Sequence, residues 1–213
     1  QKMSKSKGNV IDPLELIEKY SADALRFTLL SMASPGRDVK LSEDRVKGYR
    51  NFLNKIWNAN NFLIQNDCKF ENIETPNDLK LNINKWIFVE FTNTNEKIKK
   101  SIDSYRFDEA ARIAYQFVWH SFCDWYLELS KTVFYSENNE NIEETRNVAS
   151  FIFTQILVIL HPFIPFLTEE IWLKNKLDKD GKDFLMLKNW SEAISNKDKD
   201  SDEVNEIIEF VSS

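Results

Sequence analysis

The sequence predicts a mainly α-helical protein, built as an antiparallel helix bundle with a small α/β segment at its N-terminus. Apolar residues recur three or four positions apart along most of the chain, which is the spacing of one face of a helix. Glycine occurs only four times in 213 residues, too rarely for a turn-rich β fold. Prolines and capping residues divide the helical stretches into lengths suited to single bundle helices.

The N-terminal segment should contain two short helices and one short strand. Asp12 can cap a helix over residues 13–20, because a proline follows it at the first helical position. Ser21 can cap a second helix over residues 22–33, which a Pro-Gly pair then ends. Alternation of polar and apolar residues predicts a short strand over 38–41.

Five longer helices should form the bundle, and they are expected over about residues 42–65, 82–104, 107–135, 143–160 and 168–177. The first of them should turn one face to the core, with the side chains Val46, Tyr49, Leu53, Ile56, Asn60 and Leu63. Residues 184–190 are expected to return as a strand or extended segment. A charged linker and the start of another helix should follow.

The third bundle helix is rich in aromatic residues, which could stack on unpaired RNA bases or pack in the core. Helical spacing favours the core, because it aligns Phe107, Ala111, Ala114, Val118, Phe122 and Trp125. We therefore expect the aromatic residues of this helix to be structural.

Residues 2–6 read Lys-Met-Ser-Lys-Ser and form the most specific motif of the chain. Two lysines three positions apart, among small residues and close to a glycine, suit the oxygens of phosphate groups. The string resembles the signature loop of class I aminoacyl-tRNA synthetases. This resemblance implies catalytic roles for Lys2 and Lys5, which would stabilise the departing pyrophosphate. It also implies that ATP is bound by Lys2, Met3, Ser4, Lys5 and Ser6.

The rest of the chain resembles the valine-specific branch of that family. The resemblance rests on residues 36–46, 49–52, 54–59, 106–111, 119–126 and 161–172. It implies a bundle of the class Ia anticodon-binding type, and an enzyme that joins valine to tRNA(Val) with ATP and Mg²⁺. Two alternatives stay open: the same region of an isoleucine or leucine ligase, and a freestanding tRNA-binding helical module.

The chain is expected to be a piece of a larger enzyme. It begins with Gln1, and its only histidines, His120 and His161, form no HIGH-type signature. Residues 1–41 would then be the end of the catalytic domain with its loop and stem-contact segment, and 42–190 the anticodon-binding bundle. Residues 191–213 would be a charged linker and the start of a C-terminal helix. Alone, such a piece should be inactive and monomeric.

Contacts with tRNA are expected near the end of the first bundle helix. Phe62 resembles the family's stacking aromatic, although Asn61 stands where those enzymes usually have arginine. Lys55 would neutralise a phosphate, and Asn58 or Asn61 would read a base edge. Arg50 completes the expected tRNA-binding set.

Charge supports an RNA partner only through its distribution. The net charge is −6, yet the first sixty residues hold eleven Lys and Arg against seven Asp and Glu. The remaining residues therefore carry −10. A basic N-terminal part and an acidic remainder fit a protein that meets nucleic acid along one edge.

The sequence disfavours a metal site, a secreted protein and a membrane-spanning segment. Cys68 and Cys123 match no metal-binding spacing, so no metal is expected, and both should be reduced thiols with Cys123 in the core. No signal peptide opens the chain, and the apolar run over 148–167 contains prolines and polar residues, as a buried helix would. A cytoplasmic protein is expected.

Three ionisable residues have expected structural roles. His161 should bond the last carbonyls of its helix. Glu169 and Glu170 should stabilise the positive end of the helix dipole. The bundle therefore offers no active site of its own.

Overall fold

The protein is described here from a computed structural model, in which residues 12–34, 36, 41–71, 74–175, 177 and 183–190 are placed. The helices of this part are α1 (Pro13–Tyr20), α2 (Ala22–Ser31), α3 (Glu43–Gln65), α4 (Asn82–Asp103), α5 (Phe107–Gln116), α6 (Leu127–Phe134), α7 (Asn139–Leu160) and α8 (Pro165–Lys174). A π-helical segment, η2 (Phe117–Tyr126), joins α5 to α6, and a 3₁₀ turn, η3 (Leu185–Leu187), follows α8. The mainly helical fold is confirmed, and these residues form no strand. Most of the strand expected over 38–41 lies outside the described residues.

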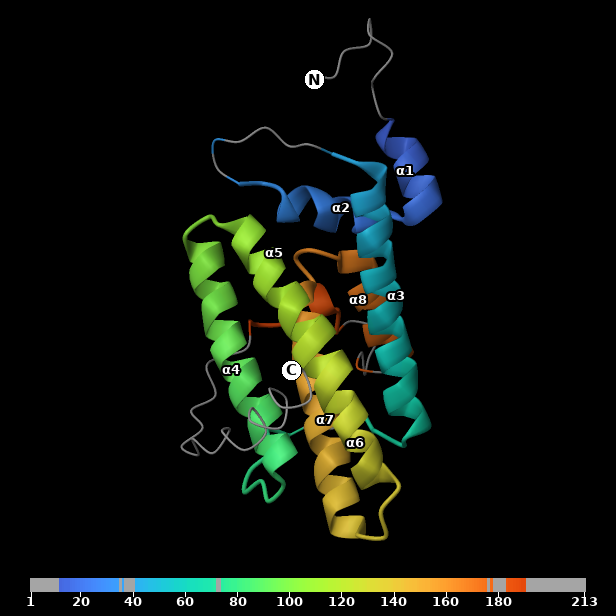
Figure 1. Ribbon diagram of the computed structural model, residues 1–213, viewed down its shortest axis with the longest axis vertical. Helices are drawn as coiled ribbons and strands as arrows, with labels where there is room; N and C mark the ends of the chain where they lie inside the picture. Colours follow the sequence, from blue (N-terminus) through green and yellow to red (C-terminus); the bar gives the residue numbers. More distant parts are fainter. Residues whose placement is uncertain are drawn as a thin grey trace, which may run out of the picture.

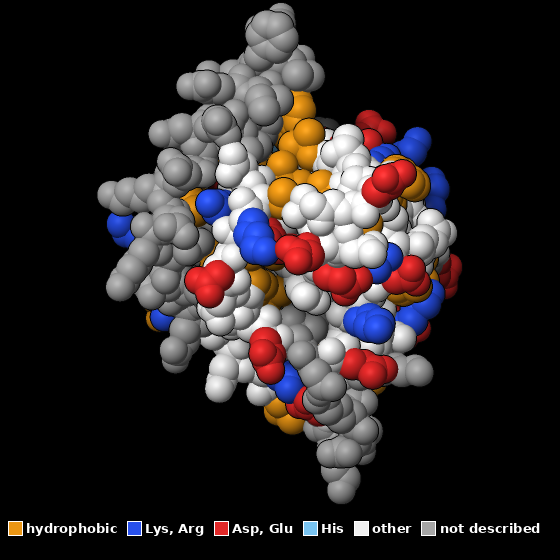
Figure 2. Space-filling view, turned by 90° about the horizontal axis from the view of Figure 1, so that it is seen from below, with side chains coloured by type: hydrophobic (Ala, Val, Ile, Leu, Met, Phe, Trp, Pro, Cys, Tyr) orange, Lys and Arg blue, Asp and Glu red, His pale blue; other side chains and the backbone are white. Residues whose placement is uncertain are grey.

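The bundle helices run along the long axis of the molecule, and α1 and α2 lie at one end (Figure 1). Helix α2 packs on α3, α5 and α8, so this N-terminal part shares the core of the bundle. At the opposite end, acidic and basic side chains are interspersed on the surface (Figure 2). None of the helices that the structure describes is long and apolar enough to cross a membrane.

Local capping sets the first two helices as the sequence predicts. The carboxylate of Asp12 accepts a hydrogen bond from the N–H of Leu14 at 2.8 Å. The hydroxyl of Ser21 accepts one from the N–H of Ala24 at 3.3 Å, and its own N–H closes α1. Helix α2 ends at Ser31, two residues before the expected end.

Two bundle helices begin earlier than expected. Helix α7 starts at Asn139 because the side chain of Asn138 accepts a hydrogen bond from Asn141 N–H at 3.2 Å. Helix α8 starts at Pro165, since a proline needs no hydrogen-bond partner at the first helical position.

The role expected for Glu169 and Glu170 is wrong, because the early start of α8 moves both beyond its first turn. The N-terminus of α8 is instead capped by Asp23 of α2, whose two carboxylate oxygens accept hydrogen bonds from Phe166 N–H at 3.3 Å and Leu167 N–H at 2.7 Å. Glu169 accepts a hydrogen bond from Leu185 N–H at 2.9 Å.

The side chain of His161 also differs from expectation. Its Nδ1 lies 2.9 Å from the hydroxyl of Thr168, and the helix carbonyls are bonded by the backbone N–H. Burial lowers the pKa of His161. The structural role of this histidine is therefore kept, but through a contact with α8.

The expected third helix is continuous, but its middle ten residues are π-helical. In a π-helix the hydrogen bonds run from i to i+5, so the turns are wider than in an α-helix. The buried positions of this segment therefore recur after four or five residues, and they are Phe117, Val118, Phe122, Cys123 and Tyr126. Tyr126 is fully buried, whereas Trp125, the expected core residue, is only half-buried.

The other core predictions hold with two exceptions, because Phe107 and Tyr49 are only half-buried. On α3, Val46, Leu53, Ile56, Asn60 and Leu63 are buried, and Tyr49 is half-buried. Phe122 packs on Phe153 of α7, which confirms a structural role. Both cysteines are buried free thiols, and burial raises the pKa of each to about 12. The described residues contain no cluster of side chains that could hold a metal ion.

The N-terminus of α4 is capped by a side chain from another helix. Glu144 of α7 accepts hydrogen bonds from Lys80 N–H at 2.9 Å and Leu81 N–H at 3.0 Å. Asn84 donates to the same carboxylate at 2.9 Å and accepts from the buried hydroxyl of Tyr126 at 2.8 Å. This network ties α4, α7 and the end of η2 together.

The segment after α8 is extended around the short turn η3, where a strand or extended segment was expected. Its last described residue, Trp190, donates from Nε1 to Asn95 Oδ1 of α4 at 2.8 Å.

Replacing Asp23 with alanine should lower the free energy of unfolding by about 1–2 kcal/mol, because two N–H groups at the start of α8 lose their acceptor. Asp12→Ala is the matched control, since that exposed cap accepts only one hydrogen bond. Urea denaturation of both variants measures the difference. An equal or smaller loss for Asp23→Ala would contradict the capping role.

Asp108 should contribute to stability at neutral pH and lose this contribution in acid. The hydroxyl of Ser34 and the guanidinium of Arg106 lower the pKa of Asp108 from 3.8 to about 2. The contribution is complete above the unfolded pKa and disappears as the pH falls through the folded value. Asp108→Asn should therefore flatten the acid loss of stability in pH-dependent urea titrations. Asp103→Asn, at an exposed position, is the control. If the free energy of unfolding falls equally with decreasing pH in both variants, Asp108 is not the source of this acid sensitivity.

Candidate nucleic-acid interface

A small groove lies between α3 and the continuous helix formed by η2 and α6. Its volume is about 160 Å³, and its walls are Lys55, Asn58, Ala59, Phe62, Cys123, Leu127, Glu128 and Lys131. Three of the five residues expected to bind tRNA, Lys55, Asn58 and Phe62, therefore lie in one groove. Arg50 and Asn61 do not line it.

Helical spacing explains both walls. On α3, Lys55, Asn58 and Phe62 are three or four positions apart and thus share a face. On the opposite wall, Cys123, Leu127 and Lys131 are four apart. The aliphatic and thiol groups form an apolar floor, and the charged groups lie at the rim.

Phe62 is half-buried and supported from one side. The ring centroid of Phe62 lies 6.2 Å from that of Phe134. The Nζ atom of Lys131 lies 5.7 Å from the same Phe62 centroid. The ring is thus neither in the central core nor free in solvent. A fixed aromatic side chain with an accessible part is suited to stacking.

Lys55 is held at the wall of the groove by contacts that the sequence did not reveal. Its ammonium binds the carboxylate of Asp124 and lies 4.3 Å from the ring centroid of Trp119. The other oxygen of Asp124 lies 3.1 Å from Nδ1 of His120. The charge of Lys55 is therefore already compensated by a carboxylate, which makes it a poorer phosphate ligand than expected.

Glu128 and Lys131 form a second ion pair at the rim of the groove. The Nζ atom of Lys131 donates to both carboxylate oxygens of Glu128 at 2.7 Å. Their side chains are 59% and 40% exposed, so solvent and a ligand can reach them. Sequence reasoning missed both residues, although their spacing of three positions is a recognisable signal for a helical ion pair.

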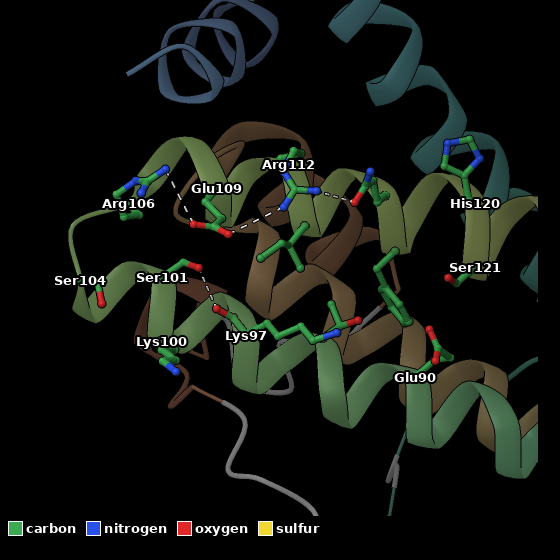
Figure 3. A pocket seen from close by; sticks show the side chains of 14 residues that line it. Glu90, Lys97, Lys100, Ser101, Ser104, Arg106, Glu109, Arg112, His120 and Ser121 are labelled. Atoms are coloured by element: carbon green, nitrogen blue, oxygen red, sulfur yellow. Dashed lines mark hydrogen bonds and ion pairs between the residues drawn. The ribbon is translucent and has the colours of Figure 1, made fainter. Parts of the chain in front are cut away.

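A separate groove of about 850 Å³ lies between α4 and α5. Arg106 and Arg112 both reach toward Glu109, while Lys100 points away from α5 (Figure 3). Arg112 also donates to Gln116 at 2.9 Å. The two arginines are already paired with Glu109 and Lys100 is directed elsewhere, so these three cations do not form a site for an external anion.

The expected catalytic and ATP-binding residues, Lys2, Met3, Ser4, Lys5 and Ser6, lie outside the described residues.

Comparison with known protein families matches two parts of the chain. The family described as the anticodon-binding domain of tRNA ligase matches residues 84–213, and that of tRNA synthetases class I (I, L, M and V) matches residues 1–42.

Similar proteins include a valine–tRNA ligase of Pelagibacter ubique (strain HTCC1062), 66% identical over 212 residues that cover 100% of this chain and 24% of the relative. A valine–tRNA ligase of Agrobacterium fabrum is 47% identical over 213 residues, 100% of this chain and 22% of the relative. The chain thus spans about a quarter of the length of these curated relatives.

A solved structure has a similar fold: the ternary complex of Agrobacterium radiobacter K84 agnB2 LeuRS with tRNA and LeuAMS. The TM-score is 0.69 at 19% identity, over 91% of this chain and 22% of that one. Since the family of the anticodon-binding domain matches more than half of the residues, this protein belongs to the anticodon-binding domain family of the class I tRNA ligases.

Proposed function

We propose that the intact protein is a valine–tRNA ligase, which activates valine with ATP and esterifies tRNA(Val) for translation. The observation that carries the proposal is the groove between α3 and α6, where Phe62 stands in a neutral, partly apolar site beside Asn58. High identity to valine–tRNA ligases over the whole chain supports the choice of valine over isoleucine or leucine.

The three parts of the chain would have separate tasks. Residues 1–41 would carry the ATP loop and the stem-contact segment, 42–190 the anticodon-binding bundle, and 191–213 the connection to a further helix. Lys2 and Lys5 would act on the triphosphate of ATP, which the complete enzyme would use with Mg²⁺. Soluble translation enzymes of this kind work in the cytoplasm, and we propose the same location here.

The groove would bind one unpaired base of the anticodon. Single-stranded RNA is recognised by stacking on aromatic rings and by hydrogen bonds to base edges. Phe62 supplies the ring, and the amide of exposed Asn58 supplies a donor and an acceptor. Arg50, exposed two turns earlier on α3, and Asn61 would contact the RNA outside the groove. Lys55 would hold the wall in place through Asp124 and Trp119.

Replacing Lys5 with alanine in the intact enzyme should reduce valine activation by roughly 10² or more, because the cation stabilises charge on the departing pyrophosphate. ATP binding should change less. Pyrophosphate exchange measures the rate. Lys7→Ala, just outside the five-residue motif, is the matched control, and an unchanged rate for Lys5→Ala would remove the loop from the mechanism.

Phe62→Ala should weaken the binding of tRNA(Val) about 5- to 150-fold, since stacking on one aromatic is worth roughly 1–3 kcal/mol. Binding of labelled tRNA to the intact protein measures this. Tyr105→Ala removes a more exposed aromatic at the α4–α5 turn and should have little effect.

The same titration with a changed anticodon identifies the site. Phe62→Ala should weaken the cognate tRNA more than the altered one. Equal binding by wild type and variant, or a large fall in melting temperature, would instead assign Phe62 to packing alone.

A further inference from the structure

We propose that Glu128 of α6 determines base specificity: its carboxylate accepts a hydrogen bond from the exocyclic amino group of the unpaired base that rests on Phe62. The inference rests on the proposed function, in which an anticodon base enters the groove between α3 and α6.

The shape of the groove fits a base. Its floor is apolar, from Ala59, Cys123 and Leu127, and its aromatic side is the ring of Phe62. The polar groups stand at the rim, where Glu128 lies. A nucleobase has the same distribution, because its faces are apolar and its edges carry donors and acceptors.

The charges disfavour a phosphate in this position. Lys131 is paired with Glu128, and Lys55 is paired with Asp124, so neither cation is free to neutralise an anion. A phosphate at the rim would also face the exposed carboxylate of Glu128, which repels it. A neutral base carries no such cost.

The two rim groups differ in hydrogen-bonding character. An ionised carboxylate only accepts, and an ammonium only donates. Together Glu128 and Lys131 complement a base edge with an amino donor beside a ring-nitrogen acceptor, as in cytosine or adenine. Uracil O4 and guanine O6 stand where cytosine and adenine have their amino groups. A uracil or guanine bound in the same position would therefore direct a carbonyl oxygen toward the carboxylate and a ring N–H toward the ammonium.

Glu128 is also fixed before RNA arrives. Lys131 donates to both of its oxygens at 2.7 Å, which favours one orientation of the carboxylate. Each oxygen has two acceptor positions, so a base amino group can bind without displacing Lys131. Less side-chain freedom is then lost on binding, which favours affinity and discrimination.

The test is a double-mutant cycle between protein and RNA, with the intact protein and anticodon stem-loop RNAs. In each RNA one loop adenine is replaced by purine, or one loop cytosine by pyrimidin-2-one, which removes only the amino group. At one loop position the wild type should lose about 5- to 150-fold in affinity. Glu128→Ala should bind the unmodified RNA more weakly by a similar factor and show no further loss with the analogue.

Glu140→Ala is the matched control, because Glu140 is exposed and paired with Lys80 at 3.1 Å in the first turn of α7, and it does not line the groove. It should leave the effect of the amino group intact. If the analogue costs the same affinity in wild type and Glu128→Ala at every loop position, while Phe62→Ala still weakens cognate binding, the inference fails and the proposed function stands. If changing the whole anticodon leaves wild-type affinity unaltered, the proposed function fails, and the inference with it.

Discussion

The structure depends on the burial of α7. Over its second half nearly every side chain is buried, including Ile152, Phe153 and Ile156, so the helix has no face that can be left in water. Each such side chain stabilises the fold by roughly 1.5–3 kcal/mol only if neighbours cover it. Helices α3, α4, α6 and α8 pack around it for this reason. The groove between α3 and α6 exists because both helices are held against one central element.

The π-helical segment η2 positions the side chains of one wall of the groove. Its wide turns place Phe122 and Tyr126 in the core, while Asp124 lies at the surface facing α3. π-Helical turns are rare and are frequently found at functional sites. Here the segment fixes the wall that faces Phe62, and it also carries His120 on the side of the α4–α5 groove.

The charges in the groove are locally neutralised. Nucleic-acid affinity usually comes from unpaired cations that contact phosphates, and it is therefore not specific for sequence. The cations that line this groove, Lys55 and Lys131, are each paired with a carboxylate. The chain as a whole carries a net charge of −6. Such a site gains little from the backbone of RNA and can respond to base identity. Attraction to phosphates would come from exposed cations elsewhere, such as Arg50 on α3.

The sequence by itself determined what depends on neighbouring residues: the caps Asp12 and Ser21, the length of α3 and α4, the buried stripe of α3, and the position of Phe62 beside it. Only the tertiary structure decided that Asp23 caps α8, that Glu144 caps α4, and that Glu128 faces the groove. Periodicity reports which side of a helix is buried, but not which distant side chain meets it. Those pairings arise when the helices pack, because orphan N–H groups and buried charges then find partners far away in the chain.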